Sequence, residues 1–226
     1  PPPSFFFKPY PGTRDPLWSR GLGDVYKRQL SGVLLLPRGQ LPLNIFENKY
    51  KAMIHDAFQN GRMIGMVQPK IDDNSGDSDI YMTGCAGRIT HLEETGPDNY
   101  FITLTGVSRF DVVKEVTRHK PYRQVVPDWA PYEADLNLSD SPEFNEAYFL
   151  KTLKRYFDAM DMACEKWDNL TDIHPEKLIA TLAMVCPFNN EEKQALLEAP
   201  CLDTRVNLIV AMMEMASSCK LSDLKH

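Results

Sequence analysis

The sequence lacks the cysteine pattern that a disulfide framework or a zinc site requires. Its five cysteines are odd in number and widely spaced, and no two of them form a CxxC pair. Free, buried thiols are typical of a reducing compartment, so we expect a cytoplasmic protein. No apolar run approaches the roughly 18–20 residues needed to cross a bilayer, and we therefore expect a soluble protein without a membrane partner.

The sequence also lacks the motifs of the common catalytic sites. There is no phosphate-cradling GxxxxGK[ST] loop, no GxSxG elbow, no HExxH zinc motif and no GxGxxG fingerprint. Cys85 and His91 would share a sheet face, but a rise of ~3.3 Å per residue separates them by ~20 Å along an extended strand. The polar stretch 71–79 departs from calcium-loop spacing, with Asp77 at position six and Thr83 at position twelve. We therefore expect no catalytic residue, metal or cofactor, and no enzyme.

Basic residues are too few for a nucleic-acid surface. The chain has 25 Lys and Arg residues against 31 Asp and Glu residues, and residues 1–29 hold five of the bases and only two of the acids. Residues 30–226 thus carry 20 bases and 29 acids, a net charge of −9. Binding to a duplex requires clustered bases that displace counterions, so this balance disfavours nucleic acid as a partner.

The two ends of the chain differ from the rest. Residues 1–29 are rich in proline and glycine and follow neither a 2-residue nor a 3.6-residue period. We expect this stretch to be non-native or disordered, with the true N-terminus missing, and we treat residues 221–226 as a tail.

Residues 30–127 contain the patterns of several short strands and one helix. Strands are predicted at 31–37, 41–46, 62–68, 82–93, 100–107, 109–116 and 122–126, separated by Gly, Pro, Asp and Asn. Tyr50, Met53, Ile54, Ala57 and Phe58 follow helical spacing, with Asn48 as the expected cap and Gly61 as the expected end. The fold class is therefore α+β, with a small β-barrel into which one helix is inserted.

The second half of the sequence predicts helices. Residues 128–140 read as a linker, and residues 141–220 as a bundle of four helices. Asn189 and Glu192 stand at capping-box spacing. The last helix is apolar around most of its circumference, so either it lies inside the bundle or Met212 and Met215 line an open, adaptable client surface.

Several motifs in order resemble one known family. The segment SGVLLLPRGQLPLNIFENKYKAMIHDAFQNGRMIGMVQP, then TGCAGRI, LTGVSRFDVVKEV, PYRQVVPDW and EEKQALLEAPCLDTR, is similar to the N-terminal substrate-binding domain of Lon proteases. The resemblance implies that the barrel is PUA-like. It also implies a stand-alone recognition domain, because the ATPase module and the Ser–Lys peptidase of full Lon enzymes are both absent from the sequence.

The resemblance implies a non-catalytic module that binds unfolded or tagged polypeptides, together with a protease or chaperone. An adaptor role and an RNA-binding role, which PUA-like barrels often have, are the alternatives. The family-motif residues are Pro42, Leu43, Phe46, Glu47, Tyr50, Gly84, Gly106, Arg109 and Phe110. Leu43 and Phe46 are expected to fill the barrel or its junction with the helix, and the glycines to mark close backbone approaches. Because a lone buried carboxylate is costly, we predict that Glu47 pairs with Arg109 and joins the helix to the barrel.

Overall fold

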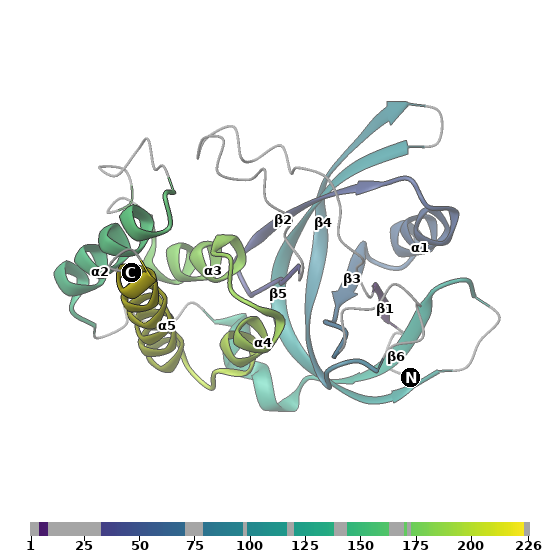
Figure 1. Cartoon of the computed structure of the whole chain (residues 1–226). Coiled ribbons are helices and arrows are strands. Elements are labelled where there is room, and N and C mark those ends of the chain that lie inside the picture. Colours follow the sequence, from purple (N-terminus) through teal and green to yellow (C-terminus); the bar gives the residue numbers. More distant parts are fainter. Residues whose placement is uncertain are drawn as a thin grey trace.

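A long antiparallel hairpin forms the centre of the fold (Figure 1). Its strands are β4 (Thr83–Gly96) and β5 (Asn99–Glu115). The computed structural model describes residues 5–8, 33–70, 79–96, 99–116, 120–137, 144–162, 170 and 173–223, without the side chains of 5–8 and 219–223. The two strands predicted at 100–107 and 109–116 are in fact one. The pairing of β4 with β5 shifts register between Ala86 and Gly87, and this irregularity lets β5 continue without a break through Ser108.

The other strands extend this hairpin into a mixed sheet with the order β2-β5-β4-β3-β1-β6, in which β6 also pairs with β5. They are β1 (Phe5–Lys8), β2 (Gln40–Ile45), β3 (Met63–Met66) and β6 (Arg123–Asp128). Only the β1–β3 pair is parallel among the strand pairs described. The strand β1 corrects the expectation that residues 1–29 are disordered throughout. Four of those residues gain backbone partners in β3 and β6.

The segment before β2 also differs from its prediction. Residues 33–36 form no strand, although Leu34, Leu35 and Leu36 are buried. The chain turns immediately afterwards, where the Gly39 N–H donates to the Leu36 carbonyl at 2.9 Å and Arg38 has a positive φ of 65°. The leucines thus contribute to the core without joining the sheet.

The inserted helix is present as α1 (Asn48–Gln59). Its buried face consists of Tyr50, Met53, Ile54 and Ala57, as the helical spacing predicts, whereas Phe58 is 37% exposed. Glu47 occupies the N-cap position and Asn48 is the first helical residue, so the predicted cap was one residue off. The chain leaves the helix through Gly61, whose φ of +86° suits glycine.

The second half of the chain is helical. It contains α2 (Glu146–Ala159), α3 (Pro175–Val185), α4 (Asn190–Glu198) and α5 (Leu202–Asp223). Residues 128–140 were predicted to be a linker, but they include the end of β6 and the 3-10 helix η3 (Ala130–Leu136). Asn145 caps helix α2, and its side chain accepts a hydrogen bond from the Tyr148 N–H. The predicted start at 141–143 lies outside the described residues, as does most of the loop 71–79.

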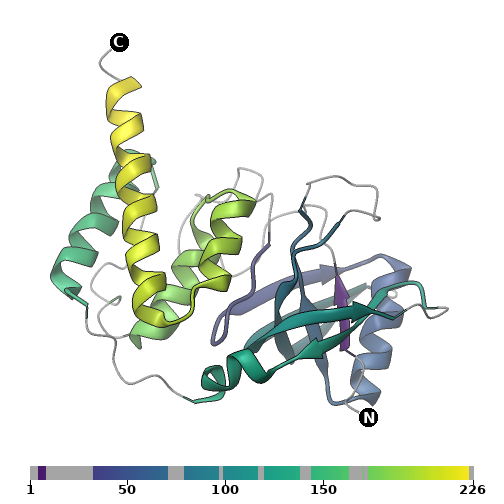
Figure 2. The same ribbon diagram turned by 90° about the horizontal axis from the view of Figure 1, so that it is seen from below.

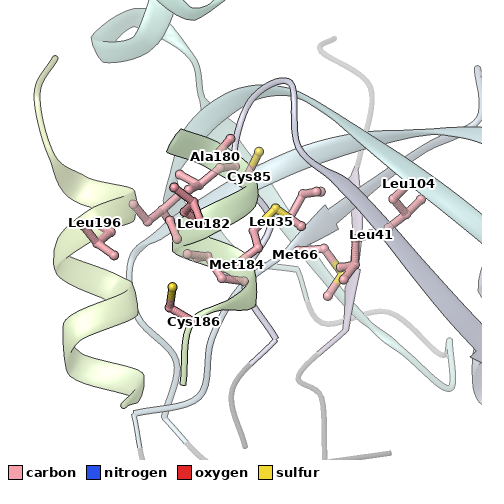
Figure 3. Packing of buried hydrophobic residues seen from close by; sticks show 14 of the residues in the cluster. Leu35, Leu41, Met66, Cys85, Leu104, Ala180, Leu182, Met184, Cys186 and Leu196 are labelled. Carbon is pink, nitrogen blue, oxygen red and sulfur yellow. The ribbon is translucent and has the colours of Figure 1, made fainter. Parts of the chain in front are cut away.

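The helices gather at one side of the sheet, and α1 lies at the other (Figures 1 and 2). One continuous hydrophobic cluster nevertheless joins the sheet and α1 to α2, α3, α4 and α5. Figure 3 shows part of this cluster, in which Met184 of α3 and Leu196 of α4 accompany Leu35, Leu41 and Met66. The strands and helices therefore share one core.

A second, smaller cluster contains Phe110, which is fully buried and whose ring lies 5.4 Å from that of Trp129. Gly84 and Gly106 are close backbone approaches, as predicted. A Cβ at Gly106 would lie 1.9 Å from the Leu36 carbonyl oxygen, and one at Gly84 would lie 2.7 Å from that of Met66. Neither position has room for a side chain.

Within the described part of the chain, none of the helices combines the length and the apolar character that crossing a bilayer demands. The described residues also include no group of three or more His, Cys, Asp or Glu side chains arranged to hold a metal ion. Of the described cysteines, Cys85 and Cys186 are buried and Cys201 is exposed, and all three are free thiols. Burial raises the pKa of Cys186 to about 12, which suits an unreactive core thiol.

Candidate functional site

Arg109 of β5 links three distant parts of the chain. Its Nε and Nη2 donate to the two carboxylate oxygens of Asp135 in η3, each at 2.8 Å, and its own N–H donates to the same carboxylate at 2.9 Å. Its Nη1 donates to the carbonyls of Leu197 and Ala199, at the end of α4, at 3.1 and 2.6 Å. The guanidinium also lies 4.6 Å from the centre of the Tyr132 ring. Arg109 therefore positions the helices against the sheet.

This arrangement corrects the predicted Glu47–Arg109 pair. Glu47 lies 3.0 Å from Nζ of Lys49, within its own helix turn, and 31% of its side chain remains exposed. Arg109 has its partner in Asp135, and their side chains are only 5% and 10% exposed. Burial lowers the pKa of Arg109, but the hydrogen bonds and charge of Asp135 outweigh it and raise the pKa overall.

A second buried arginine completes the end of α4. Arg205, in the first turn of α5, donates from Nε to the Leu196 carbonyl at 2.8 Å. Burial and the nearby charge of Arg109 together lower the pKa of Arg205 to about 10. The last carbonyls of a helix have no partner within it, and here two arginines from different elements bind them.

A chain of hydrogen-bonded polar side chains continues the junction. Gln194 of α4 donates to the Thr83 carbonyl of β4 at 3.2 Å, and Gln68 donates to Gln194 at 3.1 Å. The Thr83 hydroxyl and the Tyr132 hydroxyl both donate to Asp111, at 2.7 and 3.0 Å. These largely buried hydrogen bonds fix the orientation of α4 on the sheet.

A groove lies between α3 and the edge of the sheet. It has a volume of about 210 Å³, and we call it the β2–α3 groove; its walls are formed by Gln40, Pro42, Phe101, Thr103, Lys177, Thr181, Met184 and Val185. Pro42 is paired with Thr103 across β2 and β5, so both belong to one sheet face. The α3 residues of the groove, Lys177, Thr181, Met184 and Val185, are successively four, three and one positions apart, which places them on one stripe of the helix.

The sequence explains this wall of β2. The Gly39 carbonyl accepts a hydrogen bond from the Gly106 N–H, so the alternating pattern turns the backbone groups of Leu41 and Leu43 toward β5. Those of Gln40 and Pro42 point away from β5. Proline has no N–H, and Pro42 thus removes a donor from the outer edge of β2 without weakening the sheet.

The groove is small and mostly apolar. Its volume falls below the 300–1,000 Å³ usual for sites that enclose a whole small molecule, so it suits single side chains better than a cofactor. Met184 packs against the bare backbone of Gly39, where an added Cβ would lie 2.4 Å from the Met184 sulfur. Next to the groove, the His91 ring contacts the Phe101 ring in an edge-on geometry, with centroids 6.0 Å apart.

The sequence-predicted residues fall into two sets. Pro42 lines the groove, while Leu43, Tyr50 and Arg109 are buried at 4%, 3% and 4% exposure. Phe46 does not fill the barrel or its junction, because it is 52% exposed.

The last helix is buried on one side, and the client surface predicted at Met212 and Met215 stays a prediction. Met213 is fully buried, Met212 is half-buried, and Met215 is 70% exposed. The wall formed by α3 was missed because its apolar residues read as ordinary core spacing.

The comparisons with known proteins agree with this fold. The family model described as "ATP-dependent protease La (LON) substrate-binding domain" matches residues 29–215. Lon protease 2 of Myxococcus xanthus is 29% identical over 191 residues, which cover 81% of this chain and 22% of that protein. Lon protease of Anaeromyxobacter dehalogenans is 28% identical, again over 81% of this chain and 22% of that protein. The chain thus spans about a fifth of the length of these relatives.

Solved structures with the same fold include the Lon N-terminal domain protein from Xanthomonas campestris. That structure has a TM-score of 0.58 at 16% identity, and the match covers 92% of this chain and 98% of that one. The N-terminal domain of Mycobacterium avium complex Lon protease also has a TM-score of 0.58, at 15% identity, with 81% and 94% covered. Taken with the family match over most of its length, these findings show that the chain belongs to the LON substrate-binding domain family.

Proposed function

We propose that this protein is a non-catalytic module that binds unfolded or tagged polypeptides, and that the β2–α3 groove receives an apolar side chain of the client. The observation that carries the proposal is a side-chain-sized, mostly apolar groove beside a sheet edge, in a family named for substrate binding. A client held in this way remains whole, so a partner protease or chaperone would act on it.

The architecture favours a rigid framework around that groove. Neighbouring pairs run from β5 through β4, β3, β1 and β6 and return to β5, which favours the PUA-like barrel of the family. We further propose that α2, α3, α4 and α5 form the helical bundle, which Arg109 holds to the barrel, while Arg205 joins α5 to α4 within the bundle. Because the barrel and the bundle are held together, the walls of the groove should change shape little when a client binds.

The proposal is tested with a fluorescently labelled, carboxymethylated protein that cannot fold. Thr181→Arg fills the groove with a long charged side chain. Gln59→Arg adds the same charge at an exposed position of α1, which lies at the other side of the sheet. Burying one leucine-sized side chain stabilises by about 1.5–3 kcal/mol, so Thr181→Arg should weaken binding about tenfold or more. Gln59→Arg should bind like the wild type in fluorescence anisotropy.

Two results would contradict the proposal. If the wild type binds no unfolded protein, the polypeptide-binding function is wrong. If Thr181→Arg binds normally while Met215→Arg loses binding, the client surface is the exposed part of α5 and the groove assignment is wrong. Clients held by apolar contacts should also remain bound as salt is raised, whereas an RNA ligand would dissociate steeply.

A further inference from the structure

The β2–α3 groove has a charge at one end. Of its eight lining residues, Lys177 alone is charged, and it lies in the first turn of α3. Met184 and Val185 lie seven and eight residues further along the same helix stripe. With a rise of 1.5 Å per residue, the groove is about 12 Å long, with a cation at one end and an apolar pair at the other.

Lys177 is available to a ligand. Its side chain is exposed, and among the residues that the structure describes no carboxylate lies within ion-pair distance of it. The adjacent Glu176 is only 7% exposed and faces Arg38, with 3.9 Å between the Glu176 carboxylate and Arg38 Nε. On the sheet side, Glu93 lies 3.8 Å from His91. The lysine therefore stands as a local cation on a body whose net charge is negative.

We propose that the groove selects client segments in which an acidic side chain lies two or three residues from a large apolar one. This inference rests on the proposed function and names the substrate class of the same site. An extended chain advances about 3.3 Å per residue, so two or three residues span ~7–10 Å, and the flexible side chain of Lys177 covers the remainder of the ~12 Å groove. The apolar side chain contacts Met184 and Val185, and the carboxylate pairs with the ammonium group of Lys177.

The structure favours side-chain insertion over the addition of a client strand to β2. An added strand would need donors and acceptors along the outer edge of β2, and Pro42 supplies no donor at its centre. An internal acidic side chain is the occupant, because unfolded clients present such carboxylates along their whole length and a terminal carboxylate only once.

The test uses three acetylated and amidated peptides that carry one leucine and, three positions away, Glu, Gln or Lys. Exposed ion pairs contribute about 0.2–1 kcal/mol, so the wild type should bind the Glu peptide up to about fivefold more tightly than the Gln peptide, and the Lys peptide least. Lys177→Glu should invert this order. Lys154→Glu, the same change at an exposed position of α2, should leave the order as in the wild type.

Equal affinity for the three peptides in the wild type would overturn the inference, as would an unchanged order in Lys177→Glu. A Gln peptide with a free C-terminus that binds as tightly as the amidated Glu peptide would show that the groove reads terminal carboxylates, and would overturn it too. In all three cases binding persists, so the proposed function stands. If neither the peptides nor the unfolded protein bind, the proposed function fails, and the inference fails with it.

Discussion

Replacement of Arg109 by leucine should remove a large part of the stability of this protein. The change leaves the Asp135 carboxylate, 10% exposed, without its bidentate partner, and it leaves the Leu197 and Ala199 carbonyls without their donor. Breaking one side of a buried ion pair costs about 3–5 kcal/mol. Domains of this kind have a total free energy of unfolding of about 5–15 kcal/mol, so Arg109→Leu should remove a large share of that free energy.

The measurement is urea-induced unfolding followed by circular dichroism, on Arg109→Leu, Asp135→Leu and the double variant. Each single change should cost about 3–5 kcal/mol, and the double variant should lose far less than the sum, because no charge is left buried alone. Arg109→Lys keeps the charge but not the planar fork, so it should lose about 1–3 kcal/mol. A loss below about 1 kcal/mol for Arg109→Leu, or additive losses in the double variant, would refute the view that this pair holds the junction.

Three further changes test other parts of the fold. Burial lowers the pKa of Lys193 to about 8, so its charged form is penalised in the folded state. Below pH 8, Lys193→Met should therefore have a free energy of unfolding about 3 kcal/mol higher than the wild type. This difference should disappear as the pH rises toward 10.5, as measured by urea titrations of both proteins at each pH. Gly106→Ala forces a methyl group onto the Leu36 carbonyl and should lower the thermal midpoint sharply, whereas Gly96→Ala, with its nearest contact at 3.8 Å, should not. Asn189→Ala removes the capping box of α4 and should cost about 1 kcal/mol in urea unfolding; no loss would show that the cap is dispensable.

Features that depend on neighbours in sequence could be predicted. The capping box needs only Asn189 and Glu192, three residues apart, and the structure has both of its hydrogen bonds. Pro175 begins α3 as its fixed φ favours. In each case a local conformational preference decides the outcome.

Features that depend on distant partners could not be predicted. Arg109 and Asp135 lie 26 residues apart, and Asp135 belongs to a stretch without hydrophobic period that reads as a linker. Lys193 and Arg205 are 1% and 6% exposed, although lysine and arginine lie at the surface in most proteins. Arg205 gains its partner through the packing of α5 against α4, where it donates to the Leu196 carbonyl. The groove depends on distant contacts too, since Met184 of α3 packs against Gly39, next to β2.

The two arginines at the end of α4 have a consequence for biosynthesis. A helix of nine residues is too short to persist alone in water. Its terminal carbonyls are bound by Arg109, which is synthesised about ninety residues earlier, and by Arg205, which follows a few residues later. While the ribosome still holds residue 205, one of these two clamps is missing. Helix α4 should therefore settle against the sheet only after the first turn of α5 has emerged.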